Sequence, residues 1–311
     1  MNLNEASKRF LAHCQSAITL SDHTTRAYRS DLADYAGFIG PRKSLASVQP
    51  EQLRGYILHL RSERGLKEST IKRKLATLKL LVKWAMHEGR LKTNPFDALN
   101  EKIRLPRRLP RALDRDDSRR LRRAVDPVAA GTDFDKMRRS AAVQLLLETG
   151  IRVGELVSIA CQDVSLSDKA IVIHGKGNRQ RLVYLYKRAL LRAIARYVER
   201  RLRIATPHDE LFISASGTPL TTAHIRRELR AMAGSAGLAR HVTPHMLRHT
   251  CATSWLESGL DIRFVQKLLG HHSISTTEIY THVSDQGLRI ALERVNQGRF
   301  RYLGIIDAGA S

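Results

Sequence analysis

The chain has 311 residues, more than a usual single domain, so two domains are expected, at least one with a full hydrophobic core. Its 53 lysines and arginines against 30 acidic residues give a formal charge of +23, and both halves of the sequence carry the excess. This charge predicts a polyanionic partner, and nucleic acid is favoured over a membrane because no apolar run approaches the about 20 residues of a membrane span. Solubility alone is the weaker explanation, since so large a surplus costs self-repulsion.

The cysteines and the first residues indicate the compartment. Cys14, Cys161 and Cys251 are odd in number and form no C-x-x-C pair, which argues against a disulfide framework and a zinc knuckle. The opening MNLNEASKRF has no apolar signal-peptide segment. We therefore expect a cytoplasmic protein.

Four helical patterns fill the first hundred residues and predict a small helical bundle, domain 1–102. They cover 3–17, a segment following Ser21, 48–65 and 69–89. The polar positions of these helices carry many basic residues. Each alone is explained by a solvated helix face, but together they favour a surface that follows DNA phosphates, with these candidates: Arg26, Arg29, Lys72, Arg73 and Lys74.

Helical periodicity stops after Lys102. The stretch up to Asp117 contains two prolines and five arginines, which predicts an extended basic linker over 103–116. Arg107 and Arg108 are its candidate DNA contacts. A second domain, 117–311, follows the linker.

The second domain is predicted to be mainly helical with one small antiparallel sheet, so the whole chain is mainly α with two domains. Two β-rich runs, 170–174 and 181–185, are joined by G-K-G-N-R-Q, which indicates a hairpin. Gly150 is expected to end one helix as a left-handed cap. The expected helices are 117–124, 134–148, 187–202, 221–233, 244–257, 262–269, 275–282 and 286–295.

Two arginines form the centre of the predicted site. Arg152 stands between a helix end and a new helix start, and alone with Glu155 it is more simply an i,i+3 salt bridge. With Arg248, however, it offers a phosphate two permanently charged forks. His245, three residues before Arg248, shares its helix face.

The other candidate residues have ordinary explanations when taken singly. Lys176 at the hairpin tip is either a solvated turn lysine or a general acid; its G-K-G lacks the spacing of a nucleotide-binding loop. His245 and His249 stand at i,i+4, but the H-E-x-x-H glutamate and a third ligand are missing, so no metal site is expected and His249 is structural. Tyr280 is a packing residue or a nucleophile activated by a positive field. His271 is a cap residue or a phosphate ligand, and His272 and His282 are surface residues.

Four motifs in one order resemble the tyrosine site-specific recombinase, or phage integrase, family, and most closely its Xer-like branch. They are T-G-I-R-V-G-E-L, H-G-K-G-N-R-Q-R, H-M-L-R-H-T and L-L-G-H-H-S-I-S-T-T-E-I-Y-T-H. The resemblance covers about residues 1–295 and implies a helical core-binding (SAM-like) DNA-binding domain followed by a catalytic domain. Matched position by position, it implies these catalytic residues, with Glu155 in a supporting role: Arg152, Lys176, His245, Arg248, His271 and the nucleophile Tyr280.

The same resemblance implies strand cleavage and rejoining through a 3′-phosphotyrosyl intermediate and a four-way junction, without metal, ATP or cofactor. The implied partner is double-stranded DNA with an inverted-repeat site, bound near the bacterial nucleoid by a tetramer of this chain alone or with a second recombinase. A type IB topoisomerase and a catalytically dead architectural protein are the alternatives. The apolar C-terminal tail is expected to pack on a neighbouring protomer, packing on its own core being the equal alternative.

Overall fold

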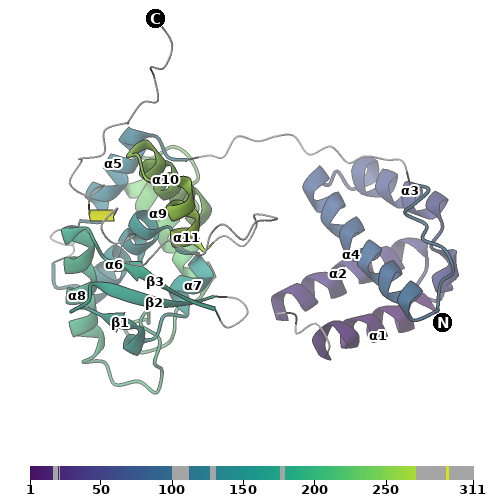
Figure 1. The fold of residues 1–311 in the computed structure, drawn as a ribbon, viewed down its shortest axis with the longest axis horizontal. Coiled ribbons are helices and arrows are strands. Elements are labelled where there is room, and N and C mark those ends of the chain that lie inside the picture. Colours follow the sequence, from purple (N-terminus) through teal and green to yellow (C-terminus); the bar gives the residue numbers. More distant parts are fainter. Residues whose placement is uncertain are drawn as a thin grey trace, which may run out of the picture. The chain divides into compact units, whose positions relative to one another are not determined.

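The computed structural model describes residues 1–16, 20, 22–99, 112–126, 131–175, 179–270 and 292–293. The chain divides into two compact units, Met1–Arg108 and Leu109–Ser311 (Figure 1). Both are mainly helical, and the second contains a small antiparallel sheet, so the predicted fold class is confirmed. No helix in the described ranges is both long and apolar enough to cross a membrane.

The N-terminal unit is a bundle of amphipathic helices. Its elements are α1 (Leu3–Ser16), α2 (Asp22–Ile39), α3 (Pro50–Leu58) and α4 (Glu68–His87), with a 3-10 turn at Leu45–Ser47 and a π-helical turn at His59–Glu63. The predicted third helix begins at Pro50, whose fixed φ suits the first helical position. The apolar stripes of α1, α2 and α4 face one another and form a separate core that includes Leu3, Tyr35 and Leu78.

The C-terminal unit packs helices around α6. Its helices are α5 (Arg115–Ala124), α6 (Phe134–Thr149), α7 (Val153–Val157), α8 (Arg188–Arg201), α9 (Thr222–Ser235), α10 (Pro244–Glu257) and α11 (Ile262–Leu269). The predicted bounds of α10 and α11 are confirmed. α5 begins two residues earlier than predicted because Asp114 caps it, its side chain accepting from the Asp117 backbone N–H at 2.7 Å.

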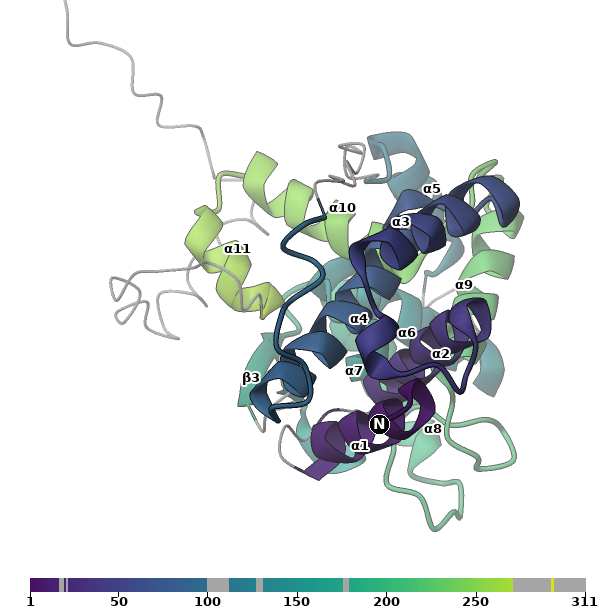
Figure 2. The same ribbon diagram turned by 90° about the vertical axis from the view of Figure 1, so that its right-hand side faces the viewer.

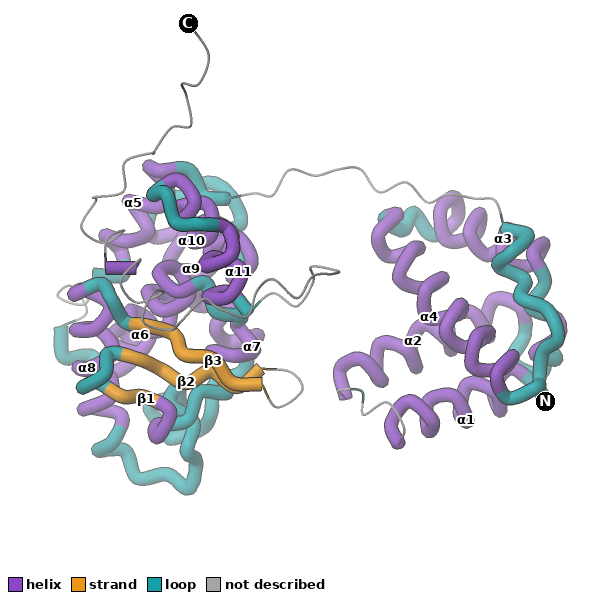
Figure 3. Tube along the Cα trace, viewed as in Figure 1, coloured by secondary structure: helices purple, strands orange, loops and turns teal. Residues whose placement is uncertain are grey.

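The sheet has the strand order β1-β2-β3, all antiparallel (Figure 3). The strands are β1 (Val164–Ser165), β2 (Ala170–Gly175) and β3 (Arg179–Tyr184). The predicted hairpin is thus confirmed, whereas the two-residue β1 was not predicted, since it is too short for a periodic pattern. In the hairpin Ile173 pairs with Arg181, which fixes the side chain of Arg181 on the same face as that of Val183.

A smaller core joins the hairpin to α10 and α11, which lie side by side (Figure 2). Trp255 and Leu268 belong to it, and so does Leu292, which is 2% exposed. Leu292 therefore packs on the core of its own chain. The rest of the predicted 286–295 helix and the tail for which packing in trans was predicted lie outside the described residues.

Candidate active site

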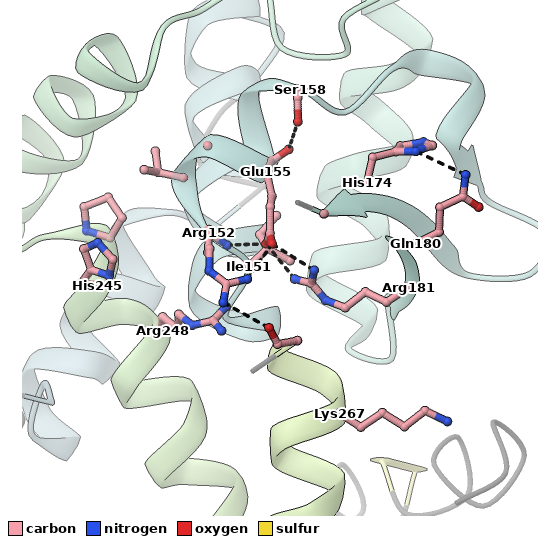
Figure 4. Close-up of a pocket in the computed structure, with 15 residues that line it drawn as sticks. Ile151, Arg152, Glu155, Ser158, His174, Gln180, Arg181, His245, Arg248 and Lys267 are labelled. Carbon is pink, nitrogen blue, oxygen red and sulfur yellow. Dashed lines mark hydrogen bonds and ion pairs between the residues drawn. The ribbon is translucent and has the colours of Figure 1, made fainter. Parts of the chain in front are cut away.

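Four elements of the C-terminal unit surround one cavity of about 720 Å³. They are the N-terminus of α7, the hairpin, the N-terminal half of α10 and the C-terminal end of α11 (Figure 4). The described lining residues include three arginines, one lysine and a single carboxylate, so the cavity is strongly basic: Arg152, Arg181, Arg248, Lys267 and Glu155. A cavity of this charge suits an anionic ligand.

Arg152 is positioned by the turn between α6 and α7. Gly150 ends α6 in the left-handed conformation (φ 62°), as predicted, and Arg152 is the N-cap of α7. One Glu155 oxygen accepts from the Arg152 backbone N–H and the other from its Nη1, both at 2.8 Å. The predicted i,i+3 salt bridge therefore exists, and the same guanidinium lines the cavity. Glu155 orients Arg152 through both its backbone and its side chain.

Arg248 enters the cavity from α10 and is largely buried. Its Nη1 donates to the Gly150 carbonyl and its Nη2 to the Leu269 carbonyl, each at 2.6 Å. Burial, and then the neighbouring charges of Arg152 and Arg181, lower the pKa of Arg248 to about 10, so it stays a cation at neutral pH. Gly150 favours this turn because its φ of 62° would strain another residue, and a Cβ here would lie 2.7 Å from Leu269 Cδ2, so the leucine side chain would have to move.

Arg181 was given no role by the sequence interpretation, yet it lies at the centre of the site. From β3 it donates to both oxygens of Glu155, at 3.0 and 2.7 Å, and its side chain is only 16% exposed. A signal was present in the sequence. Val183 is apolar and faces the core, so strand alternation places Arg181, two residues earlier, on the inner face, where an unpaired arginine is costly.

The C-terminal end of α11 links the three arginines. The carbonyls of Leu268, Leu269 and Gly270 accept, in order, from Arg181 Nε at 3.1 Å, Arg248 Nη2 at 2.6 Å and Arg152 Nη2 at 3.1 Å. These carbonyls lack intrahelical partners, and they form the negative end of the helix dipole. The end of α11 therefore holds all three guanidinium groups in fixed positions relative to Gly270, the residue directly before His271.

His245 lies at the start of α10, where Pro244 occupies the first helical position. Its exposed ring lines the cavity on the same side of the helix as Arg248 (Figure 4). On the hairpin, His174 bonds Asp163 at 2.9 Å and lies within 3.4 Å of Gln180. The other residues predicted for the site, Lys176, His271 and Tyr280, lie outside the described residues. So do His272 and His282.

The basic residues predicted to contact DNA from the N-terminal unit fall into two groups. Arg26, Arg29 and Lys72 are exposed, as expected for a basic surface. Arg73 is half exposed and paired with Asp31.

The prediction that Lys74 belongs to the exposed face is wrong. Its side chain is 8% exposed, and its Nζ lies 3.4 Å from Asp31 Oδ1 and 3.0 Å from Asp34 Oδ2. A charge this buried needs acidic partners, and with both in place Lys74 is not presented to a phosphate. Arg107 and Arg108 lie outside the described residues.

Comparison with known proteins assigns both units. The phage integrase family matches residues 111–287, and the N-terminal SAM-like domain of phage integrases matches residues 8–89. The tyrosine recombinase XerC of Listeria innocua serovar 6a is 35% identical over 294 residues, which cover 92% of this chain and 95% of the relative. The tyrosine recombinase XerC of Xanthomonas campestris pv. campestris strain B100 is 33% identical over 285 residues, covering 91% and 85%.

The fold agrees with a solved structure as well. The Tn1549 transposon integrase in complex with transposon right end DNA superposes with a TM-score of 0.73 at 19% identity, covering 95% of this chain and all of the other. Because the family matches more than half of the chain, and because relatives above 30% identity span nearly all of it, this chain belongs to the phage integrase family of tyrosine recombinases.

Proposed function

We propose that this enzyme performs site-specific recombination with Tyr280 as nucleophile and with Arg152 and Arg248 as the clamp for the scissile phosphate. The observation that carries the proposal is the convergence of two guanidinium groups from α7 and α10 in one basic cavity. Glu155 and the Gly270 carbonyl hold Arg152, and the Gly150 and Leu269 carbonyls hold Arg248, so both arginines are ordered before a substrate arrives. Preorganised donors of this kind stabilise the charge that develops on a phosphorane.

In the proposed reaction the Tyr280 oxygen attacks the phosphorus and the bond to the 5′ oxygen breaks. Lys176 donates a proton to that leaving oxygen, because an alkoxide leaves poorly without one. His245 and His271 assist through the phosphate oxygens or the proton of Tyr280. The 5′ hydroxyl of a partner duplex then attacks the 3′-phosphotyrosyl bond and releases the tyrosine. Since this bond retains the phosphodiester energy, ATP is not required for rejoining.

We further propose the assembly in which this reaction occurs. The N-terminal domain 1–102 and the basic linker bind double-stranded DNA; the linker, predicted over 103–116, ends before α5 begins at Arg115, and the domain from α5 onwards carries the chemistry. Two inverted-repeat sites and four protomers exchange strands through a four-way junction at the bacterial nucleoid. The lambda integrase tetramer bound to a Holliday junction supports the fold of such a protomer, with a TM-score of 0.68 at 18% identity over 92% of this chain and 80% of that one. The protomers are identical, or two of them come from a second recombinase.

The first experiment uses nicked duplexes tiled from the DNA that flanks the gene. The full-length protein is incubated with each tile, and covalent adducts are resolved on denaturing gels and mapped by mass spectrometry. We expect an adduct on Tyr280 and none with Tyr280→Phe. Tight binding of the wild type without an adduct on any tile would favour a target site remote from the gene or the architectural alternative. The relatives and structures named above lend no support to the topoisomerase alternative.

A second experiment isolates the proposed general acid. A 5′-bridging phosphorothiolate contains a leaving group that needs no proton, so Lys176→Ala should cleave it far better than it cleaves ordinary DNA. Lys136→Ala, an exposed lysine on α6, is the matched control and should treat both substrates as the wild type does. Equal cleavage of both substrates by Lys176→Ala would remove Lys176 from this role.

A further inference from the structure

We infer that Arg181 is a positioning residue of the phosphate clamp: it neutralises and orients Glu155, so that Glu155 holds Arg152 without reducing the positive charge offered to the phosphate. This inference rests on the proposed function of Arg152 and Arg248. Arg181 acts through Glu155 and the end of α11, and needs no contact with DNA.

The first step of the argument is the geometry around Glu155. Its carboxylate is 9% exposed and accepts four bonds, two from Arg181 and two from Arg152 (Figure 4). Arg181 spans both oxygens with Nη1 and Nη2, so it fixes the plane of the carboxylate. That plane determines where Arg152 receives its two bonds.

The second step is the charge in the cavity. The cluster of Arg152, Arg181, Arg248 and Glu155 has two net positive charges, whereas without Arg181 it has one; Lys267, which also lines the cavity, adds one positive charge in both cases. A phosphorane formed from a phosphodiester and a tyrosinate carries two negative charges, so the intact cluster matches it. Without Arg181, the carboxylate of Glu155 would cancel one of the two clamp charges instead.

The third step is the contact of Arg181 with α11. Its Nε donates to the Leu268 carbonyl, and a Cβ at Gly270 would lie only 3.2 Å from its Nη1. Gly270, with φ 64°, lets the chain pass this close to the guanidinium. Arg181 thus ties β3, Glu155 of α7 and the end of α11 to one another, and the adjacent carbonyls of Leu269 and Gly270 hold the two clamp arginines.

The test compares full-length Arg181→Ala and Arg181→Lys with a matched control, Arg240→Ala. Arg240 makes the same kinds of contact outside the cavity: its Nε donates to Asp117 at 2.9 Å, its Nη2 to Asp114 at 3.1 Å and its Nη1 to the Ala112 carbonyl at 3.2 Å. Inorganic phosphate, followed by calorimetry, probes the clamp itself. Single-turnover cleavage of the nicked duplex that the wild type cleaves probes the chemistry, and melting curves report folding.

We expect Arg181→Ala to weaken phosphate binding about tenfold and to slow saturated cleavage by about 10- to 100-fold, the range found when groups that orient metal ligands are removed. Arg181→Lys should recover part of the phosphate affinity and part of the cleavage rate. It restores the positive charge, but an ammonium cannot span both Glu155 oxygens and the Leu268 carbonyl. Arg240→Ala should leave phosphate binding and the cleavage rate unchanged, although it should lower the melting temperature.

The pH profile separates positioning from simple stabilisation. Burial raises the pKa of Glu155, but the bonds from Arg181 and Arg152 outweigh burial and lower it below its usual value. Without Arg181 that pKa rises, so the loss of cleavage at acidic pH should begin at a higher pH in Arg181→Ala than in the wild type. If Arg181 only stabilised the fold, the pH at which cleavage is lost on the acidic side would be the same in Arg181→Ala and in the wild type.

The inference is wrong if Arg181→Ala binds phosphate as tightly as the wild type, or if its losses equal those of Arg240→Ala and follow only the melting temperature. A different result would count against the proposed function alone: no Tyr280 adduct from the wild type on any tile, with phosphate binding still weakened by Arg181→Ala. The anion clamp would then stand without the recombination reaction.

Discussion

Two buried ionic clusters, one in each unit, are built on opposite plans. In the N-terminal unit, Asp31 and Asp34 form ion pairs with Lys74, and Arg73 and Arg64 pair with them at the edge of the cluster. The acidic side chains therefore offset the charge of the basic ones. In the C-terminal unit the one carboxylate, Glu155, accepts from Arg152 and Arg181, while backbone carbonyls accept the other bonds of these two arginines and both bonds of Arg248. Carbonyls satisfy a guanidinium without cancelling its charge. The first cluster is therefore suited to stability and the second to binding an anion.

Removing Asp31 should break the first cluster with the largest effect on stability. Asp31 is fully buried and bonds Arg73, Lys74 and Thr77, so Asp31→Ala leaves the Lys74 ammonium with Asp34 alone. We expect the free energy of unfolding of this unit to fall by about 3 kcal/mol. The measurement is urea unfolding followed through Trp84 in a Trp255→Phe background.

A second variant tests whether charge burial causes that loss. Asp31→Leu combined with Lys74→Met removes both charges and fills the space with apolar side chains, so it should be more stable than Asp31→Ala. If the double variant were the less stable of the two, packing rather than unpaired charge would explain the effect of Asp31.

Removing Arg248 should break the second cluster with a large effect on the chemistry. Arg248→Ala removes one of the two guanidinium groups of the clamp. It also removes the hydrogen bonds that Arg248 donates to the Gly150 and Leu269 carbonyls. We expect single-turnover cleavage to slow by about 10²- to 10³-fold, as when an oxyanion donor is lost, with DNA binding retained. Arg248→Lys should remain impaired, because one ammonium cannot reach both carbonyls and a phosphate. Cleavage at the wild-type rate by either variant would exclude Arg248 from the clamp.

Acid should weaken the N-terminal cluster in a defined pH window. Burial raises the pKa of Asp34, but bonds from Tyr56, Arg64 and Lys74 outweigh it and bring this pKa from 3.8 to about 2. Because the folded pKa is the lower one, ionised Asp34 stabilises the unit above pH 4, and this stability is lost as the pH falls towards 2.

The expected contribution of Asp34 is about 2 kcal/mol, measured as the difference in urea unfolding free energy between pH 5 and pH 2.5. Asp34→Asn is the control and should show a smaller acid-induced loss than the wild type. The same pH dependence in both proteins would mean that other carboxylates cause it.

The elements with a periodic pattern of apolar residues could be predicted from the sequence. Helical periodicity located α10 and α11 to the residue, and the left-handed cap at Gly150 followed from its glycine and its place after an apolar helix. β1 was missed because two residues carry no period. Lys74 was placed on the wrong face because its aspartate partners lie some forty residues away on α2, and spacing along one helix cannot reveal them.

The centre of the candidate site was only partly predictable. Arg152 and Arg248 were selected because forked cations suit a phosphate, and both line the cavity. For Arg181, strand alternation could have indicated an inward-facing side chain, but not its partners Glu155 and Leu268, because both are distant in sequence. Local patterns reveal which residue types are present, whereas shared partners appear only when the chain is folded.

The smallest expected effect separates two lysines of α4 that lie two residues apart. Lys72 is exposed, so Lys72→Ala should weaken DNA binding only modestly while lowering the slope of log affinity against log salt concentration by about 1, the value for one lost phosphate contact. Lys74→Ala should leave that slope unchanged and instead destabilise the unit, because it removes the cation shared by the buried Asp31 and the partly buried Asp34. Binding of a nonspecific duplex at several salt concentrations, at a temperature where both variants are folded, measures the two slopes. If Lys74→Ala lowered the slope as much as Lys72→Ala, the N-terminal cluster would open on DNA and its cation would reach a phosphate, and the contrast between a closed structural cluster and an open anion site would fail.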